Sequence, residues 1–180
     1  SIETNGKIKQ GQLTSTSLIS SQDIGDATLS LNTRPFDERI PLEGKLVMEG
    51  LNVAPFKPLS PAIRTLTGKL NGDIRLSGYV DDPALNGELA ISNGAIDIQD
   101  TPVTLADWNQ KVVLDGQTAA LDGAFVLGGG KGALKGNIDW SSDPSATFNL
   151  KGNGFEIRQP NIRLKGSRNI DIAAPKEKVD

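Results

Sequence analysis

The feature that most constrains this chain is an alternation of apolar and polar residues with a period of two. From residue 66 onward, every second position is apolar or glycine, and polar residues or Tyr fill the positions between them. Successive side chains of a β-strand point to opposite faces, so this pattern predicts a strand with one apolar and one polar face. The alternating positions are Leu66, Gly68, Leu70, Gly72, Ile74, Leu76, Gly78 and Val80.

The same alternation recurs in four other stretches, at residues 42–48, 85–91, 121–127 and 132–140. Turn signals between the stretches leave no room for crossover helices, so neighbouring strands should pair antiparallel. Where the phase shifts by one residue, as between Ile91 and Ile96, we expect a turn or a bulge. The turn signals are Asp81-Asp82-Pro83, Asn93-Gly94, Asp115-Gly116, Asp122-Gly123, Gly128-Gly129-Gly130, Asp143-Pro144 and Asn153-Gly154.

Only two short segments favour a helix. Residues 60–66 begin with Ser60 and Pro61, which are typical of a helix start, and the second segment surrounds Asp107 and Trp108. Neither segment is long enough to cover a sheet.

A weak internal repeat indicates an array of similar units. Residues 72–94 are echoed by residues 136–154, and each copy reads as a strand, an Asp-Pro turn, a strand and an Asn-Gly turn. We therefore expect residues 1–180 to form a single β-rich domain taken from a longer repetitive protein. The charged, proline-led residues 175–180 are interpreted as a frayed tail or a linker.

The composition excludes several classes of function. The chain has no His and no Cys, which removes Ser-His and Cys-His nucleophiles, zinc sites built on those residues, thiol redox chemistry and disulfides. Its net charge of -3, with Lys and Arg spread singly, gives no electrostatic footprint for nucleic acid. No apolar run approaches the length of a transmembrane helix, and the start lacks a signal peptide pattern, so we expect a mature soluble chain or one excised from something larger.

Two features that could carry chemistry have simpler explanations. Acidic pairs would suit a carboxylate enzyme or a metal site, but most of them lie beside turns, where Asp caps the backbone. Residues 128–133 resemble a dinucleotide-binding glycine loop, but the alternation that follows predicts a strand where that motif needs a helix. We therefore expect no enzyme, no cofactor and no metal. The acidic pairs are Asp81/Asp82, Asp97/Asp100 and Asp37/Glu38.

Glycines lie in phase with the leucines, on the face that a packed core would fill with side chains. They could allow curvature or close backbone approach, or they could leave a trough that an apolar client occupies, and the two interpretations are compatible. In an open trough, Gly72→Leu and Gly136→Leu should leave the fold nearly intact. The sequence thus predicts an all-β fold with almost no helix, an elongated and strongly curved, mainly antiparallel sheet forming a trough with a hydrophobic concave face.

The residues expected to line this hydrophobic groove occupy the alternating apolar positions of the predicted strands. Trp140 is in phase with Leu134 and Ile138, which makes it a core or groove-end aromatic or else an interfacial contact, and Trp108 could take either role. The predicted lining residues are Leu46, Met48, Leu70, Ile74, Leu76, Val80, Leu85, Leu89, Ile91, Ile96, Ile98, Leu121, Phe125, Leu127, Leu134, Ile138, Trp140, Phe148 and Leu150.

An ordered string of segments resembles a known family. It comprises Leu-Asn-Val-Ala-Pro-Phe at 51–56, Leu-Thr-Gly-Lys-Leu-Asn-Gly-Asp-Ile-Arg-Leu-Ser-Gly at 66–78, Pro-Ala-Leu-Asn-Gly-Glu-Leu at 83–89 and Asn-Gly at 93–94. Over about residues 40–165, the chain resembles the C-terminal domain of the TamB family of translocation and assembly module subunits, within the wider AsmA-like group.

The resemblance implies a protein that is anchored in the inner membrane of Gram-negative bacteria and spans the periplasm. It also implies an outer-membrane Omp85-type barrel (TamA) as partner, with roles in outer-membrane protein assembly and phospholipid transport. The client would be a phospholipid or a nascent outer-membrane protein. A lipid needs a groove lined by side chains, whereas a nascent strand needs an exposed sheet edge.

Two rival functions stay open. A purely structural or adhesive β-array would have a self-packed apolar face and would contact a partner through its exposed residues. A carboxylate enzyme would need two acids within reach of one pocket.

Overall fold

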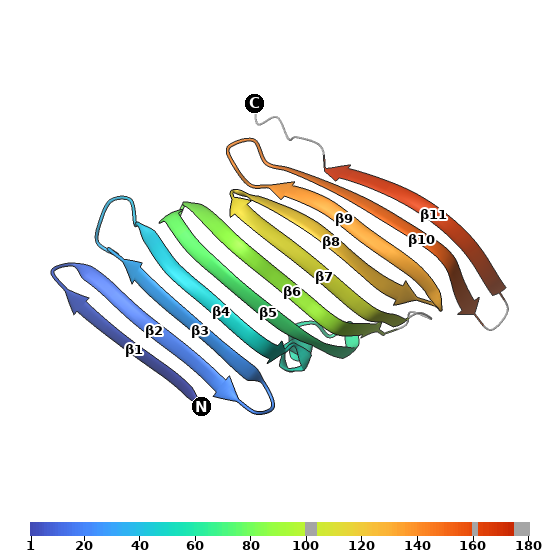
Figure 1. Ribbon diagram of the computed structural model, residues 1–180, viewed down its shortest axis with the longest axis horizontal. Helices are drawn as coiled ribbons and strands as arrows, with labels where there is room; N and C mark the ends of the chain where they lie inside the picture. The colour runs from blue at the N-terminus through green and yellow to red at the C-terminus, as the bar shows by residue number, and fades with distance from the viewer. Residues whose placement is uncertain (100–103, 160–161, 175–180) are drawn as a thin grey trace.

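The chain forms one antiparallel sheet of eleven strands whose spatial order is their order in the sequence (Figure 1). This computed structural model describes residues 1–99, 104–159 and 162–174, with side chains described up to residue 154 except for residue 59. The predicted tail at 175–180 lies outside the described residues. The strands are β1 (Ile2–Lys9), β2 (Gln12–Ser21), β3 (Gly25–Thr33), β4 (Leu42–Asn52), β5 (Ile63–Tyr79), β6 (Asp82–Ile98), β7 (Thr104–Gly116), β8 (Thr118–Leu127), β9 (Gly130–Asp139), β10 (Ser145–Gln159) and β11 (Ile162–Ala174).

The register keeps the alternating residues of neighbouring strands on the same face. Leu46 of β4 lies opposite Ile74 of β5, and Leu76 of β5 lies opposite Leu85 of β6. Within β5 the apolar positions are more buried than the polar positions between them. The all-β, antiparallel prediction is therefore confirmed.

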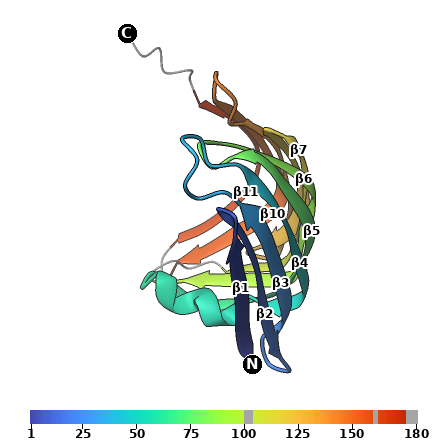
Figure 2. The same cartoon turned by 90° about the vertical axis from the view of Figure 1, so that its left-hand side faces the viewer.

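The sheet is open, and its curvature is more modest than predicted. The strands bend along their length (Figure 2), but the sheet is not strongly curled, and β1 and β11 lie at its two edges. The expectation of a strongly curved sheet is therefore wrong. The physical reason is that the β-bulges, which bend the strands, occupy only part of the length of β4–β7. Along the rest of these strands, the backbone hydrogen bonds between neighbours follow the regular antiparallel pattern.

A line of β-bulges crosses four neighbouring strands at a similar level. The register shifts beside Gly50 in β4, Gly68 in β5, Asn93 in β6 and Asp107 in β7, and all four residues have positive φ. Bulges bend strands and increase their twist. The predicted phase shift between Ile91 and Ile96 is confirmed as one of these bulges.

Side-chain amides accept hydrogen bonds from backbone groups at two of these bulges. The Gly50 N–H donates to Asn71 Oδ1 at 2.8 Å, and the Asn93 N–H donates to Asn109 Oδ1 at 3.2 Å. Because an unpaired N–H is unfavourable wherever water is excluded, these amides stabilise the bulged conformation.

Three of the predicted turns are parts of strands instead. Asn93-Gly94 lies within β6, Asp122-Gly123 within β8 and Asn153-Gly154 within β10. The first and last of these dipeptides coincide with bulges, where a residue of positive φ is also needed. The other turn signals are confirmed, since they fall at the ends of strands or between them.

The predicted repeat corresponds to two hairpins with the same plan. Residues 72–94 include parts of β5 and β6, and residues 136–154 include parts of β9 and β10. In both, an Asp-Pro dipeptide lies at the connection and an Asn-Gly dipeptide lies at a bulge. The repeat unit is therefore a hairpin whose second strand is bulged.

The helix predictions are wrong in both places. A short 3-10 helix, η1 (Ala54–Leu59), precedes the predicted segment. Ser60, expected to start a helix, instead follows the end of η1. Pro55 lies in its first turn and Pro58 lies inside it, and proline fixes φ near the value that a 3-10 helix needs. The residues around Asp107 belong to β7. In the described part of the chain, no helix has the length and apolar character to cross a membrane.

The hydrophobic core is thin because the sheet has one layer. Met48, Leu51 and Ile74 form its most buried cluster, each 7–8% exposed. Leu46, Leu70, Leu85, Leu89 and Leu114 pack against this cluster and stay partly buried.

Large side chains of neighbouring strands cover several glycines of the apolar face. A Cβ at Gly136 would lie 2.7 Å from Phe148 Cδ1 and 2.8 Å from the Thr147 carbonyl oxygen, and a Cβ at Gly72 would lie 2.9 Å from Met48 Cε. The expectation of open space above these glycines is therefore wrong, because cross-strand neighbours fill it without a second layer.

This packing predicts that Gly136→Leu destabilises the sheet. We expect its free energy of unfolding to fall by about 1–3 kcal/mol, because the new side chain overlaps the Phe148 ring and the backbone beside it. The measurement is urea denaturation followed by circular dichroism.

Gly6→Leu is the matched control. Gly6 lies in β1, and a Cβ there would meet only Ser15 Cβ at 3.7 Å and the Thr14 carbonyl oxygen at 3.9 Å. We expect little change, or a small gain from the higher strand propensity of leucine. Equal losses in both variants would contradict the packing described here.

Candidate functional site

The candidate site is the apolar face that the register builds across β3 to β10. Its rows cross the strands, as in the row that runs from Leu46 through Ile74 and Gly87 to Leu114. We define the apolar face by these residues: Ala27, Leu29, Leu31, Leu46, Met48, Leu51, Leu70, Ile74, Leu76, Leu85, Leu89, Ile91, Val112, Leu114, Leu121, Phe125, Leu134, Ile138, Phe148 and Leu150.

Most of the predicted lining residues belong to this face. Ile96 rejoins it beyond the bulge, opposite Leu66 and Leu105, and Leu127 continues it at the end of β8. Two others lie apart: Val80 is in the turn after β5 and is 58% exposed, and Ile98 ends β6 and is 43% exposed.

Trp140 also lies apart from the strand rows. It follows the end of β9, and its indole Nε1 donates a hydrogen bond to the Pro83 carbonyl oxygen at 3.1 Å. Of the interpretations considered for it, this position fits a half-buried aromatic at the end of the face. Trp108 is half-buried within β7 and packs over Gly94, where a Cβ would lie 3.0 Å from its ring.

The alternation in the sequence does not predict several residues of the apolar face. Leu29 and Leu31 alternate in β3, and this short signal was available. Val112 and Leu114 flank Val113, so a continuous apolar run hides the alternation in β7. The pairing with β6 and β8 shows that Val112 and Leu114 lie on the apolar face.

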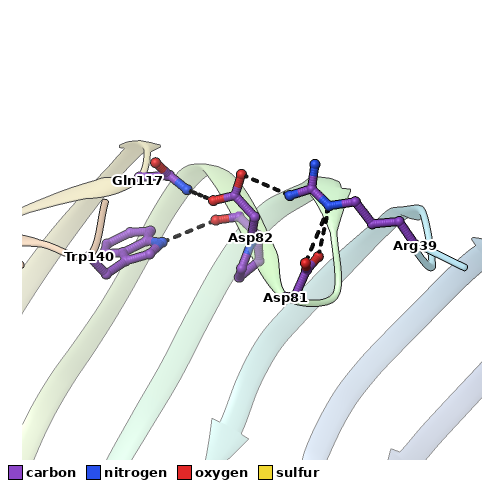
Figure 3. Close-up of polar contacts among 6 residues, drawn as sticks. Arg39, Asp81, Asp82, Gln117 and Trp140 are labelled. Atoms are coloured by element: carbon purple, nitrogen blue, oxygen red, sulfur yellow. Dashed lines mark hydrogen bonds and ion pairs between the residues drawn. The ribbon is translucent and has the colours of Figure 1, made fainter. Parts of the chain in front are cut away.

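A polar network joins the strand connections at one end of the sheet, which we call the rim (Figure 3). Arg39, in the β3–β4 connection, pairs with Asp81 at 3.2 Å and with Asp82 at 3.3 Å. Asp82 accepts a hydrogen bond from the Gln117 side-chain amide, and the backbone N–H of Trp140 donates to the backbone carbonyl oxygen of Gln117 at 3.0 Å. The rim thus links four successive hairpin connections.

The rim pairs are exposed, so each contributes little by itself. The side chains of Arg39 and Asp81 are 51% and 66% exposed, and exposed ion pairs contribute about 0–1 kcal/mol. The Arg39 guanidinium also stacks on the Tyr79 ring at 4.0 Å from its centroid. Several weak contacts together align neighbouring connections.

Neither acidic pair that the structure describes in full, Asp81/Asp82 or Asp37/Glu38, brings both of its carboxylates to one of the two hollows described below; of these four residues, Asp37 alone lines one. Asp81 and Asp82 pair with Arg39, and Asp97 pairs with Arg64 at 3.3 Å. Asp100, the partner predicted for Asp97, lies outside the described residues. Asp37 and Glu38 are exposed in the β3–β4 connection. Among the residues the structure describes, no group of three or more acidic side chains could hold a metal.

The glycine loop at 128–130 joins two strands. It connects β8 to β9, and Gly128 and Gly129 have φ of 55° and 79°. Such values suit a tight hairpin turn. No helix start follows the loop, since β9 begins at Gly130. The prediction that a strand follows this loop is therefore confirmed.

Two hollows lie near β2–β5, away from the centre of the apolar face. One, of about 430 Å³, crosses the row of Ser15, Leu31, Gly44 and Leu76. The other, of about 490 Å³, is polar and lies beside the rim, where Arg39 and Tyr79 line it with other residues.

Comparison with known proteins gives a consistent result. A family model described as "TamB, N-terminal domain" matches residues 1–91. The translocation and assembly module subunit TamB of Haemophilus influenzae is 26% identical over 140 residues, which cover 76% of this chain and 11% of that protein. The alignment thus spans about a tenth of the length of this curated relative. No solved structure matches the chain.

The comparison corrects one expectation from the sequence. The matched model describes an N-terminal domain and begins at residue 1, whereas the resemblance placed the chain in a C-terminal domain. Glycine-rich alternating strands are suited to any part of a long sheet, so such a string does not show where in a longer protein it lies.

The face assignment predicts opposite outcomes for one substitution at two adjacent positions. Ile138→Asp puts a carboxylate on the apolar face opposite Ala119 and Ala146, and should lower the free energy of unfolding by about 2–4 kcal/mol. Asn137→Asp, on the polar face, should change it by less than about 0.5 kcal/mol. Denaturant unfolding measures both, and similar losses would show that the faces are assigned wrongly.

Proposed function

Because the chain belongs to the TamB family, we propose that it is a non-enzymatic section of a translocation and assembly module, in which the apolar face shields apolar clients from water. The observation that carries this proposal is an apolar face that extends across eight strands with no second layer of described strands over it. We further propose that this face is the concave one and forms a shallow hydrophobic groove.

The physical basis is the transfer of hydrocarbon out of water. Each buried methylene contributes about 0.8 kcal/mol, so an acyl chain laid along the face gains on the order of 10 kcal/mol from continuous cover. Cross-strand side chains fill the glycine positions, as Met48 does at Gly72. An evenly filled face supports movement along it, because no position holds a client much more tightly than the next.

The client we propose is a phospholipid on its way to the outer membrane, a nascent outer-membrane protein, or both. The partner is an outer-membrane Omp85-type barrel (TamA), and the location is the periplasm, as part of a protein anchored in the inner membrane of a Gram-negative bacterium. Family membership and the name of the relative, "translocation and assembly module subunit", support these assignments. The open edges of the sheet suit a place within a longer repetitive protein.

The rival structural or adhesive β-array requires a fully self-packed apolar face. Cross-strand side chains fill the glycine positions, but covering the whole face would need a second layer, and the described strands all belong to one sheet. This observation favours the shielding function over the rival.

Photo-crosslinking from the two faces tests the proposal. A photoreactive residue at Leu89 on the apolar face should capture phospholipid or an outer-membrane client, identified by mass spectrometry, when the protein is expressed in Gram-negative cells. The same residue at Ala90, the next position on the polar face, is the matched control and should capture neither, since its side chain points away from the apolar face. Equal capture at both positions, or none at Leu89, would refute the shielding function.

A further inference from the structure

One amide interrupts the apolar face at the middle of the sheet. Gln110 of β7 is only 7% exposed, and the register places it between Ile91 of β6 and Gly123 of β8. It is the one buried polar residue among the side chains that the structure describes.

The hydrogen bonding of Gln110 is incomplete. Its Nε2 donates to the Lys111 carbonyl oxygen at 3.3 Å, whereas its Oε1 has no hydrogen-bond partner among the described residues. A buried acceptor without a partner destabilises a fold, and an apolar side chain of similar size avoids that penalty. Stability therefore does not explain glutamine at this position.

The amide rests where the neighbouring strand offers a glycine. A Cβ at Gly123 would collide with Gln110 Oε1, so this glycine makes the space that the amide occupies. All the described strands lie in one sheet, so the flexible side chain can rotate away from Gly123 toward the open side of the face. That rotation would present Oε1 to a molecule lying on the apolar face.

We propose that Gln110 is a specificity-determining hydrogen-bond acceptor for a polypeptide client that lies on the apolar face in an extended conformation. An acyl chain has no N–H or O–H group to donate to Oε1, whereas an extended peptide has backbone N–H donors along its whole length. This inference rests on the proposed shielding function, and it selects the nascent protein as the client that contacts this position.

Peptides with and without backbone donors test the inference. The probes are a fluorescent ten-residue peptide of alternating valine and threonine, the same peptide with its backbone amides N-methylated, and a fluorescent fatty acid. We expect the chain to bind the unmodified peptide roughly two- to tenfold more tightly than the methylated one, the range expected for one hydrogen bond.

Gln110→Met removes the acceptor and keeps a side chain of similar length. It should abolish the preference for the unmodified peptide, should not weaken the binding of the fatty acid, because it makes the face more apolar, and should raise the midpoint of thermal unfolding. Val112→Met, on the same face of the same strand, is the matched control and should keep the preference.

The outcomes separate this inference from the proposed function. If Gln110→Met keeps the preference, or weakens the binding of peptide and fatty acid alike, Gln110 does not select a peptide. If the unaltered chain binds only the fatty acid, the inference fails and the shielding function stands. If it binds none of the probes, both fail.

Discussion

The structure depends on one constraint: each strand obtains its backbone hydrogen bonds from its sequence neighbours, and no second layer of described strands covers the sheet. The apolar side chains must therefore cover one another within a single face. They do so by laying large side chains over glycines of the next strand, as Phe125 does at Gly132 and Phe148 at Gly136. Glycine in these strands is thus part of the packing, with the space above it filled from the side.

The polar face keeps the opposite surface in water while it helps to hold the register. Ion pairs join neighbouring strands at Lys45–Asp73, Lys111–Glu88 and Lys135–Asp122, with N–O distances of 2.7–2.9 Å. Such exposed pairs add little to stability. A one-residue slip would turn every side chain of a strand to the wrong face and would also separate these charges, so the two faces specify the same register.

The alternation of apolar and polar side chains made the main strands and the apolar face predictable from the sequence. The first strands were not predictable in this way, because Ser15 and Ser17 occupy the apolar side of β2 and polar residues on both faces hide the alternation. Asn-Gly was assigned to turns because a bulge and a turn both need positive φ, and only pairing with a neighbour distinguishes them. The buried position of Gln110 could not be predicted, because the run Val112-Val113-Leu114 hides the phase of β7, and only pairing with β6 and β8 places Gln110 on the apolar face.

The rim could not be predicted because it depends on distant segments. Arg39 and Asp81 are 42 residues apart, and Trp140 and Pro83 are 57 apart. These contacts form because whole hairpins pair side by side in the sheet, which brings alternate strand connections to the same end. No local pattern in the sequence carries that information.

The sequential strand order also determines how such a sheet can assemble and how it can change in length. Each new strand needs only the preceding strand to pair with, so folding can start at any hairpin and add one strand at a time. The loops that must close in each step are short, which lowers the entropic cost of closing them. If a whole hairpin is inserted or deleted, the strands that follow it keep both their direction and the face on which their apolar side chains lie. A gene encoding this architecture can therefore lengthen or shorten its product two strands at a time, while every remaining neighbour keeps its partner.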